Sequence, residues 1–207
     1  MESIRESIRD VAGKEPRVMT SRFAGMVDPQ ICEILLTEIG LSKSQVEHFL
    51  PKVLARMGEV YRGMEKKVAL NSGVLGLLGI LAISPRFVLG VLTGNLSSVA
   101  EEKLVITGIR PYFSDLFCAD NYFDRTQLVE DAVQTCLKKY GLNSRTDVLI
   151  IGDTPRDIAA ANAAEATSVG ISSGVFSTVQ LREAKASQVY QSLEPTRELL
   201  SGLGVTG

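Results

Sequence analysis

The strongest constraint on the fold is the alternation of short apolar runs with helical patterns in the second half of the chain. Each run is only a few residues long and ends at a polar turn that leads into a segment of helical periodicity. Short apolar strands that alternate with crossover helices are typical of a parallel sheet covered on both faces. The sequence therefore predicts an α/β fold with a doubly wound parallel (Rossmann-like) sheet, with strands at Phe87–Leu92, Asp115–Ala119, Val148–Ile151 and Ser168–Ile171.

The first half of the chain lacks such runs and is predicted to be helical. Asp28-Pro29 is typical of a helix start, because the carboxylate can cap free N–H groups and proline is tolerated in the first turn. Apolar residues then follow at helical spacing as far as Tyr61, and we expect Pro51 to break or kink this pattern. We predict an inserted helical cap over residues 16–66, a core of residues 1–15 and 67–207, and a hinge at Lys66–Ser72.

Composition argues against several classes of partner. The chain has 22 Lys and Arg against 24 Asp and Glu, scattered along the sequence without a basic stripe for nucleic acid. No apolar run is long enough to span a membrane, so we predict a cytoplasmic protein that binds a small molecule. The three cysteines lie far apart and His48 is the single histidine, which favours reduced thiols over a zinc site or a disulfide framework.

The run Val148–Ile151 leads to the most informative polar residues. It is followed by Gly152-Asp153-Thr154-Pro155-Arg156-Asp157, a pattern that indicates a strand turning at once into a helix. Ligand sites in open α/β sheets lie at the carboxyl ends of strands, and Asp157, one helical turn after Asp153, would face the same way. Two such carboxylates suit Mg²⁺. The alternative is a simple helix cap, which explains Asp157 but not Asp153.

A second polar turn follows the run Phe87–Leu92. Its residues are Thr93-Gly94-Asn95, and a hydroxyl beside the free N–H groups of a turn is suited to phosphate oxygens. The alternative is an ordinary strand-to-helix turn whose side chains satisfy its own backbone. Two such turns at the same edge of one sheet favour a ligand site.

Four segments together resemble the haloacid dehalogenase-like superfamily, in particular its phosphoglycolate-phosphatase-like group. Thr93-Gly94-Asn95 is similar to the second motif of that family, and Gly152-Asp153-Thr154-Pro155-Arg156-Asp157 is similar to the fourth. The third-motif region resembles Asp120–Val129, with Arg125 where many members have lysine. The cap loop resembles Phe23–Ile31. The resemblance covers nearly the whole chain.

The resemblance implies Mg²⁺-assisted hydrolysis of small phosphate monoesters through an aspartyl phosphate. Thr93 and Gly94 would bind the transferring phosphoryl group, with Asn95 in support, and Arg125 would neutralise its charge. Asp153 would bind Mg²⁺ directly and Asp157 would stand behind it.

Two basic residues compete for the cationic role, and each has a structural alternative. Arg125 could instead be a solvated residue in the first turn of a helix over Thr126–Leu137. Lys103 is the second candidate, although its position before Leu104 fits a helix on the flank of the sheet. His48 lies on the polar side of a helical pattern and is not expected to be catalytic.

The family's first motif, Asp-x-Asp-Gly-Thr at the end of the first strand, does not occur in these 207 residues. Only Met1-Glu2-Ser3 precede the helical pattern that would follow it, so we expect the first strand, the nucleophile, the acid/base and one metal ligand to be absent. The strands that end at Thr93 and Asp153 would then either close up against each other or leave the chain poorly stable.

Two further positions depart from the family pattern. Glu165 stands where the family's helix usually ends in glycine, and we expect a left-handed backbone there at a cost of roughly 1 kcal/mol. Val27 stands where the cap loop often has threonine, and cap contacts set the substrate.

Three hypotheses remain open at this point. The first is a phosphatase whose nucleophile strand lies upstream of Met1, the second is a non-catalytic homologue that binds phosphate or a protein, and the third is a helical interaction module on a residual sheet. We prefer the family's phosphatase function and expect the 207-residue chain itself to be nearly inert.

Overall fold

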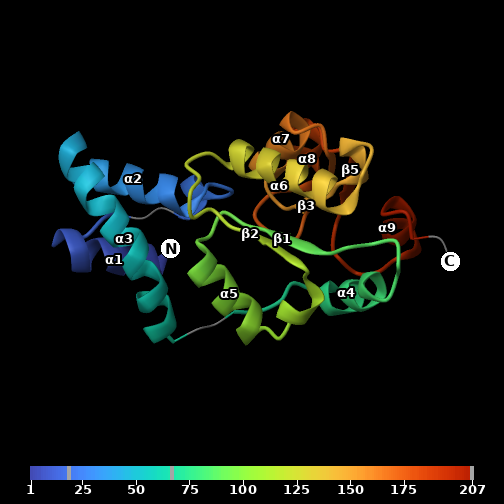
Figure 1. The fold of residues 1–207 in the computed structure, drawn as a ribbon, viewed down its shortest axis with the longest axis horizontal. Coiled ribbons are helices and arrows are strands. Elements are labelled where there is room, and N and C mark those ends of the chain that lie inside the picture. Colours follow the sequence, from blue (N-terminus) through green and yellow to red (C-terminus); the bar gives the residue numbers. More distant parts are fainter. Residues whose placement is uncertain (18–19, 66–67, 206–207) are drawn as a thin grey trace.

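The computed structural model describes residues 1–17, 20–65 and 68–205. Its first part contains three helices, α1 (Glu2–Ala12), α2 (Asp28–Glu38) and α3 (Lys43–Gly63), and a short 3-10 turn, η1 (Thr20–Phe23). Figure 1 shows these helices grouped at one end of the molecule. The prediction of helices uninterrupted by strands is confirmed for the described residues of the 16–66 segment, whereas its division from the core as a separate cap stays a prediction.

The starts of α2 and α3 follow different rules. Helix α2 begins at Asp28 as predicted, but Val27 is its N-cap and the Asp28 side chain makes no capping bond. Helix α3 begins after Ser42, which forms a capping box with Gln45. The expected break at Pro51 is wrong, because α3 continues through it with buried residues on both sides of the proline. Packing of that buried face outweighs the one backbone hydrogen bond that proline removes.

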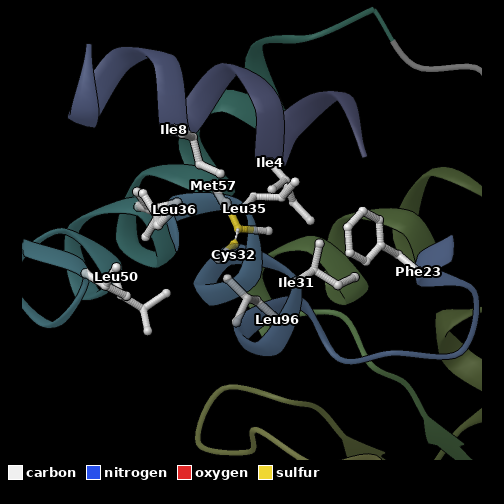
Figure 2. Close-up of a cluster of buried hydrophobic side chains, with 12 residues drawn as sticks. Ile4, Ile8, Phe23, Ile31, Cys32, Leu35, Leu36, Leu50, Met57 and Leu96 are labelled. Carbon is white, nitrogen blue, oxygen red and sulfur yellow. Dashed lines mark hydrogen bonds between the residues drawn. The ribbon is translucent and has the colours of Figure 1, made fainter. Parts of the chain in front are cut away.

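Helix α1 packs on the other two helices of the first part. Ile4 and Ile8 of α1 lie in one apolar cluster with side chains of α2 and α3, as Figure 2 shows. Leu96, just before α5 (Ser97–Ile106), joins the same cluster and so connects these helices to the second part. The buried members are Ile4, Ile8, Phe23, Ile31, Cys32, Leu35, Leu36, Val46, Leu50, Val53, Met57 and Leu96.

The second part alternates strands and helices. Figure 1 shows α4 and α5 on one side of strands β1 and β2, and α6, α7 and α8 on the other. The four predicted strands are confirmed. The first two are shorter than predicted, the third is shifted by one residue toward the C-terminus, and the fourth begins one residue earlier. A fifth strand, β5, was not predicted. In chain order the elements are α4 (Val74–Ala82), β1 (Gly90–Leu92), α5 (Ser97–Ile106), η2 (Arg110–Tyr112), β2 (Asp115–Phe117), α6 (Arg125–Tyr140), η3 (Arg145–Asp147), β3 (Leu149–Gly152), α7 (Pro155–Ala163), β4 (Thr167–Ile171), α8 (Thr178–Glu183), β5 (Gln188–Tyr190) and α9 (Arg197–Gly202).

All strand pairs are parallel, as predicted, but they form two separate sheets. One sheet has the order β1-β2 and the other has the order β3-β4-β5. The strands that end at Thr93 and Asp153 therefore do not close up against each other. Each sheet has its own apolar cluster beneath it, with Leu78, Leu104 and Ile109 at the first and Val169 and Ile171 at the second.

Three other expectations are settled by the structure. The backbone of Glu165 is left-handed, with φ 57°, as predicted from its place after α7. The three cysteines are free and form no disulfide. Among the described residues, no helix has the length and apolar character that a membrane crossing requires. The predicted hinge at Lys66–Ser72 begins with Lys66 and Lys67, which lie outside the described residues.

Candidate active site

The turn after β3 holds Asp157 in a fixed position. One carboxylate oxygen of Asp157, Oδ2, accepts hydrogen bonds from the Thr154 backbone N–H (3.0 Å) and hydroxyl (2.8 Å). The Thr154 hydroxyl oxygen accepts in turn from the Asp157 N–H, so the two residues form a capping box at the start of α7. Gly152 is required beside them, because a Cβ there would lie 2.4 Å from the Asp157 Cβ. Asp157 therefore does cap the start of α7, as the alternative interpretation proposed. The cap uses only one of its two carboxylate oxygens.

Arg125 reaches the other oxygen of the same carboxylate. Its Nη2 lies 2.6 Å from Asp157 Oδ1, and the two side chains are only 16% and 7% exposed. The pair is an ion pair without hydrogen-bond geometry, since Asp157 Oδ1 and Arg125 Nε are buried with no hydrogen-bond partner among the described residues. Arg125 is the first residue of α6, yet it is not the solvated surface residue of the alternative interpretation. A buried, incompletely satisfied charge pair is typical of a site that takes up a further charged ligand.

Asp153 adds a second carboxylate to this edge. Burial raises the pKa of Asp153, the neighbouring Asp157 raises it further, and Arg125 opposes them. A Cβ on Gly174 would lie 2.7 Å from Asp153 Oδ2, so the loop after β4 closes over this carboxylate. A divalent cation would stabilise the charged form of Asp153 beside this second carboxylate.

The turn after β1 lies at the same edge as these residues. A Cβ on Gly94 would lie 3.2 Å from Arg125 Nη1, and the other end of that guanidinium contacts Asp157. The carboxyl ends of β1 and β3 therefore meet at Arg125, as expected for parallel strands. A Cβ on Gly94 would also lie 2.5 Å from the Met26 carbonyl oxygen, so only glycine permits the loop before α2 to approach this closely.

The N–H groups of Asn95, Leu96 and Ser97, in and after the turn that follows β1, are already hydrogen-bonded, contrary to expectation. The Asn95 N–H donates to Thr93 Oγ1 (3.2 Å), and the Leu96 N–H donates to Asp28 Oδ2 (3.0 Å). The Ser97 N–H donates to the carboxylate of Asp120 (3.2 and 3.0 Å). The start of α5 is thus already occupied by side-chain oxygens. The Thr93 hydroxyl, which accepts one of these bonds, keeps its own proton for a ligand.

Asp28 is the site residue whose role the sequence did not reveal. Its buried carboxylate accepts two bonds from the Asn95 side-chain amide (3.2 Å each), and its N–H donates to the Gly94 carbonyl (2.7 Å). Burial raises the pKa of Asp28, and hydrogen bonds from Leu96 and Asn95 oppose the rise. The pair of residues Asp28-Pro29 signalled a helix start only, because the partners of the carboxylate lie far along the chain.

Lys103 completes this part of the site. Its Nζ donates to Asn95 Oδ1 (2.7 Å) and lies 5.7 Å from the centre of the Tyr61 ring in α3. Burial lowers the pKa of Lys103, and the charge of Asp28 opposes the change. Burial likewise lowers the pKa of the Met1 α-amino group, which Asp28 opposes, so the N-terminus lies in the same charged cluster. Lys103 therefore orients Asn95, while Arg125 is the basic residue in contact with Asp157.

The carboxylates at this edge are too few to hold a metal by themselves. Among the residues that the structure describes, no group of three or more His, Cys, Asp or Glu side chains could hold a metal ion. Mg²⁺ usually takes one or two carboxylates and completes its shell with water and phosphate oxygens. Asp153 and Asp157 fit that pattern.

Comparisons with known proteins agree with this fold. The model of the haloacid dehalogenase-like hydrolase family matches residues 5–171. A β-phosphoglucomutase from Clostridium difficile superposes with a TM-score of 0.71 at 16% identity, over 98% of this chain and 89% of that one. A predicted phosphoglycolate phosphatase from Haemophilus somnus gives 0.69 at 18% identity, over 97% and 88%, and a hydrolase from Pseudomonas syringae gives 0.69 at 23%, over 98% and 90%. A comparison with curated protein sequences found no match.

Proposed function

Because this chain belongs to the haloacid dehalogenase-like hydrolase family, we propose that its site serves the hydrolysis of small phosphate monoesters of the phosphoglycolate type. The observation that supports this most directly is the buried Arg125–Asp157 ion pair beside Asp153 and the Thr93–Gly94 turn. At such an edge a guanidinium and a hydroxyl group can bind phosphoryl oxygens, and the carboxylates can bind a metal ion. Structural neighbours named as a phosphoglycolate phosphatase and a phosphoglucomutase are consistent with a phosphorylated substrate.

The residues at this edge would divide the work of the reaction between them. The Thr93 hydroxyl would donate its proton to a phosphoryl oxygen, and Asn95 would hold the turn in place through its bond to Asp28. Arg125 would place positive charge beside the transferring group while it remains paired with Asp157. Asp153 would hold Mg²⁺ directly, and Asp157, which is paired with Thr154 and Arg125, would stand behind it. The bound ion would supply further positive charge to the phosphoryl oxygens. The cytoplasm remains our proposal for where this takes place.

We propose that the 207-residue chain is nearly inactive without an added nucleophile. The reaction of this family needs a carboxylate that attacks phosphorus in line and a second acid that protonates the leaving oxygen. No Asp-x-Asp-Gly-Thr stands in the sequence to supply them. The Met1 amino group lies near Asp28 and Lys103, so a strand added ahead of α1 would end close to the Thr93–Asn95 turn.

The second candidate function is that of a non-catalytic homologue that binds phosphate or a protein. Asp28 and Asp120 support its protein-binding form, because their carboxylates already occupy the N–H groups of Leu96 and Ser97 that a phosphate would use. Absence of both phosphate binding and turnover in the extended form would favour this alternative.

The test compares the 207-residue chain with a form extended ahead of Met1 by a strand that ends in Asp-x-Asp-Gly-Thr. Turnover of p-nitrophenyl phosphate is measured with and without Mg²⁺. We expect Mg²⁺-dependent turnover only in the extended form, and a loss of roughly 100-fold or more on Asp153→Asn in that form. Asp131→Asn on the exposed face of α6 is the matched control and should change nothing. Robust Mg²⁺-dependent turnover by the 207-residue chain, insensitive to Asp153→Asn, would refute the proposal.

A further inference from the structure

Arg156 joins the start of α7 to the loop that precedes α2. Its Nη1 donates hydrogen bonds to the carbonyl oxygens of Ala24 and, at 3.5 Å, of Arg22. Both acceptors are main-chain groups at the end of η1, where a helical turn leaves carbonyl oxygens without a helical partner. Arg156 stands between Asp153 and Asp157 in the chain. It therefore connects the candidate site to a loop that lies 132 and 134 positions earlier in the sequence.

Gly25 lets this loop lie directly on the turn after β3. Its φ is 75°, and a Cβ there would lie 2.5 Å from Thr154 Oγ1 and 3.0 Å from Arg156 Cβ. The Thr154 hydroxyl is not free to move aside, because it belongs to the capping box with Asp157 at the start of α7. A side chain at position 25 would therefore meet both an unfavourable backbone conformation and a fixed neighbour.

The other end of the loop is attached to the turn after β1. The Asp28 N–H donates to the Gly94 carbonyl (2.7 Å), and Val27 is fully buried in an apolar cluster. Residues 22–28, which we call the bridging loop, therefore span the two turns of the candidate site. Because each end is held by a different turn, loss of one attachment would release one end and leave the other in place.

We infer that Arg156 is a positioning residue: it holds the bridging loop on the turn that carries Asp153 and so fixes where the loop lies relative to the candidate site. The inference rests on the proposed function for the reaction that the loop would serve. Nη1 carries two N–H donors, one for each carbonyl oxygen. Because both acceptors are main-chain atoms, Arg156 holds the loop whatever side chains the loop presents to a substrate. Arg156 is exposed, so its loss should release the loop without unfolding the protein.

Trypsin cleavage after Arg22 tests this attachment, because the carbonyl of the Arg22–Phe23 bond is one of the two acceptors. The folded 207-residue protein is digested briefly, and the fragments are quantified by mass spectrometry. Arg156→Met keeps an unbranched stem without the donors and should speed this cleavage roughly tenfold or more. Arg156→Lys keeps a charged donor and should stay within about threefold of the parent. Arg182→Met, at an exposed arginine of α8, is the matched control and should change nothing.

A second measurement separates positioning from a purely structural role. In the form extended by Asp-x-Asp-Gly-Thr, Arg156→Met should raise KM for p-nitrophenyl phosphate roughly tenfold with less effect on kcat, because the loop moves and the reacting groups do not. Cleavage of Arg156→Met at the parent rate, equal rates for the Met and Lys variants, faster cleavage throughout the chain, or an unchanged KM would each overturn the inference. An extended form without turnover would instead refute the proposed function, and the cleavage rates alone would then decide the inference.

Discussion

Glu165 carries a backbone conformation that L-amino acids other than Asn and Asp seldom adopt. Its φ of 57° ends the turn after α7, where glycine has no Cβ to collide with the backbone. We expect Glu165→Gly to raise the free energy of unfolding by about 1 kcal/mol, measured by urea denaturation. Lys185, with φ 66° after α8, offers a second instance, and Lys185→Gly should give a gain of the same sign.

The control for this prediction is the neighbouring residue. Ala164 is buried and its φ is −84°, so Ala164→Gly gains no conformational relief and loses a packed methyl group. This variant should be less stable than the parent protein. Equal effects of Glu165→Gly and Ala164→Gly would show that the backbone conformation is not the cause.

At the scale of elements, the Asp28 carboxylate joins α2 to the turn before α5 through hydrogen bonds to Asn95 and Leu96. Its removal leaves the buried Leu96 N–H and the half-buried Asn95 amide without their acceptor. We expect Asp28→Ala to lower the free energy of unfolding by about 1–3 kcal/mol in urea denaturation. Glu33→Ala, an exposed acid of the same helix, should stay within about 0.5 kcal/mol of the parent. A small effect of Asp28→Ala would mean that water replaces the carboxylate at no cost.

Strand β2 and helix α6 are joined by an ion pair whose effect depends on pH. Lys139 Nζ lies 2.5 Å from Asp115 Oδ1, and the Tyr140 hydroxyl donates to the same carboxylate. Burial alone would raise the pKa of Asp115, but the hydrogen bonds from Lys139 and Tyr140 outweigh it and lower the pKa. A lowered folded-state pKa stabilises the protein above the unfolded pKa, and this contribution is lost as the pH falls through the folded value.

Asp115→Asn should therefore destabilise the protein more at about pH 7 than at about pH 3. The measurement is urea denaturation of both proteins at each pH. A difference that is constant with pH would indicate lost packing of the side chain rather than lost charge. Asp131→Asn, on the exposed side of α6, serves as the control at both values.

At the scale of the whole molecule, the sequence predicted single strands and helices better than it predicted which of them pair. Strand β3 and the helix start at Asp28 follow from apolar runs and turn residues, which are local properties of the chain. The bond between Asp28 and Asn95 joins residues 67 positions apart, and no local pattern encodes it. Strand β5 was missed because Gln188–Tyr190 is short, lies at an edge and is only partly apolar. The division into two sheets depends on which strands meet in space.

The division into two sheets leaves one edge of β1 and one edge of β3 without a described partner strand, and these edges affect recovery of the protein from denaturant. Apolar segments of other unfolded chains can pair with an open strand edge. Such pairing between chains competes with folding as the protein concentration rises. Refolding yield, measured as soluble protein after dilution from urea, should therefore fall between about 1 and about 50 µM protein. Ile151→Lys places a charge on the exposed isoleucine of β3 and should raise the yield at high concentration. Ile83→Lys, at an isoleucine that is 85% exposed outside the strands, should not, because the interface for aggregation is the edge of a sheet and not apolar surface in general.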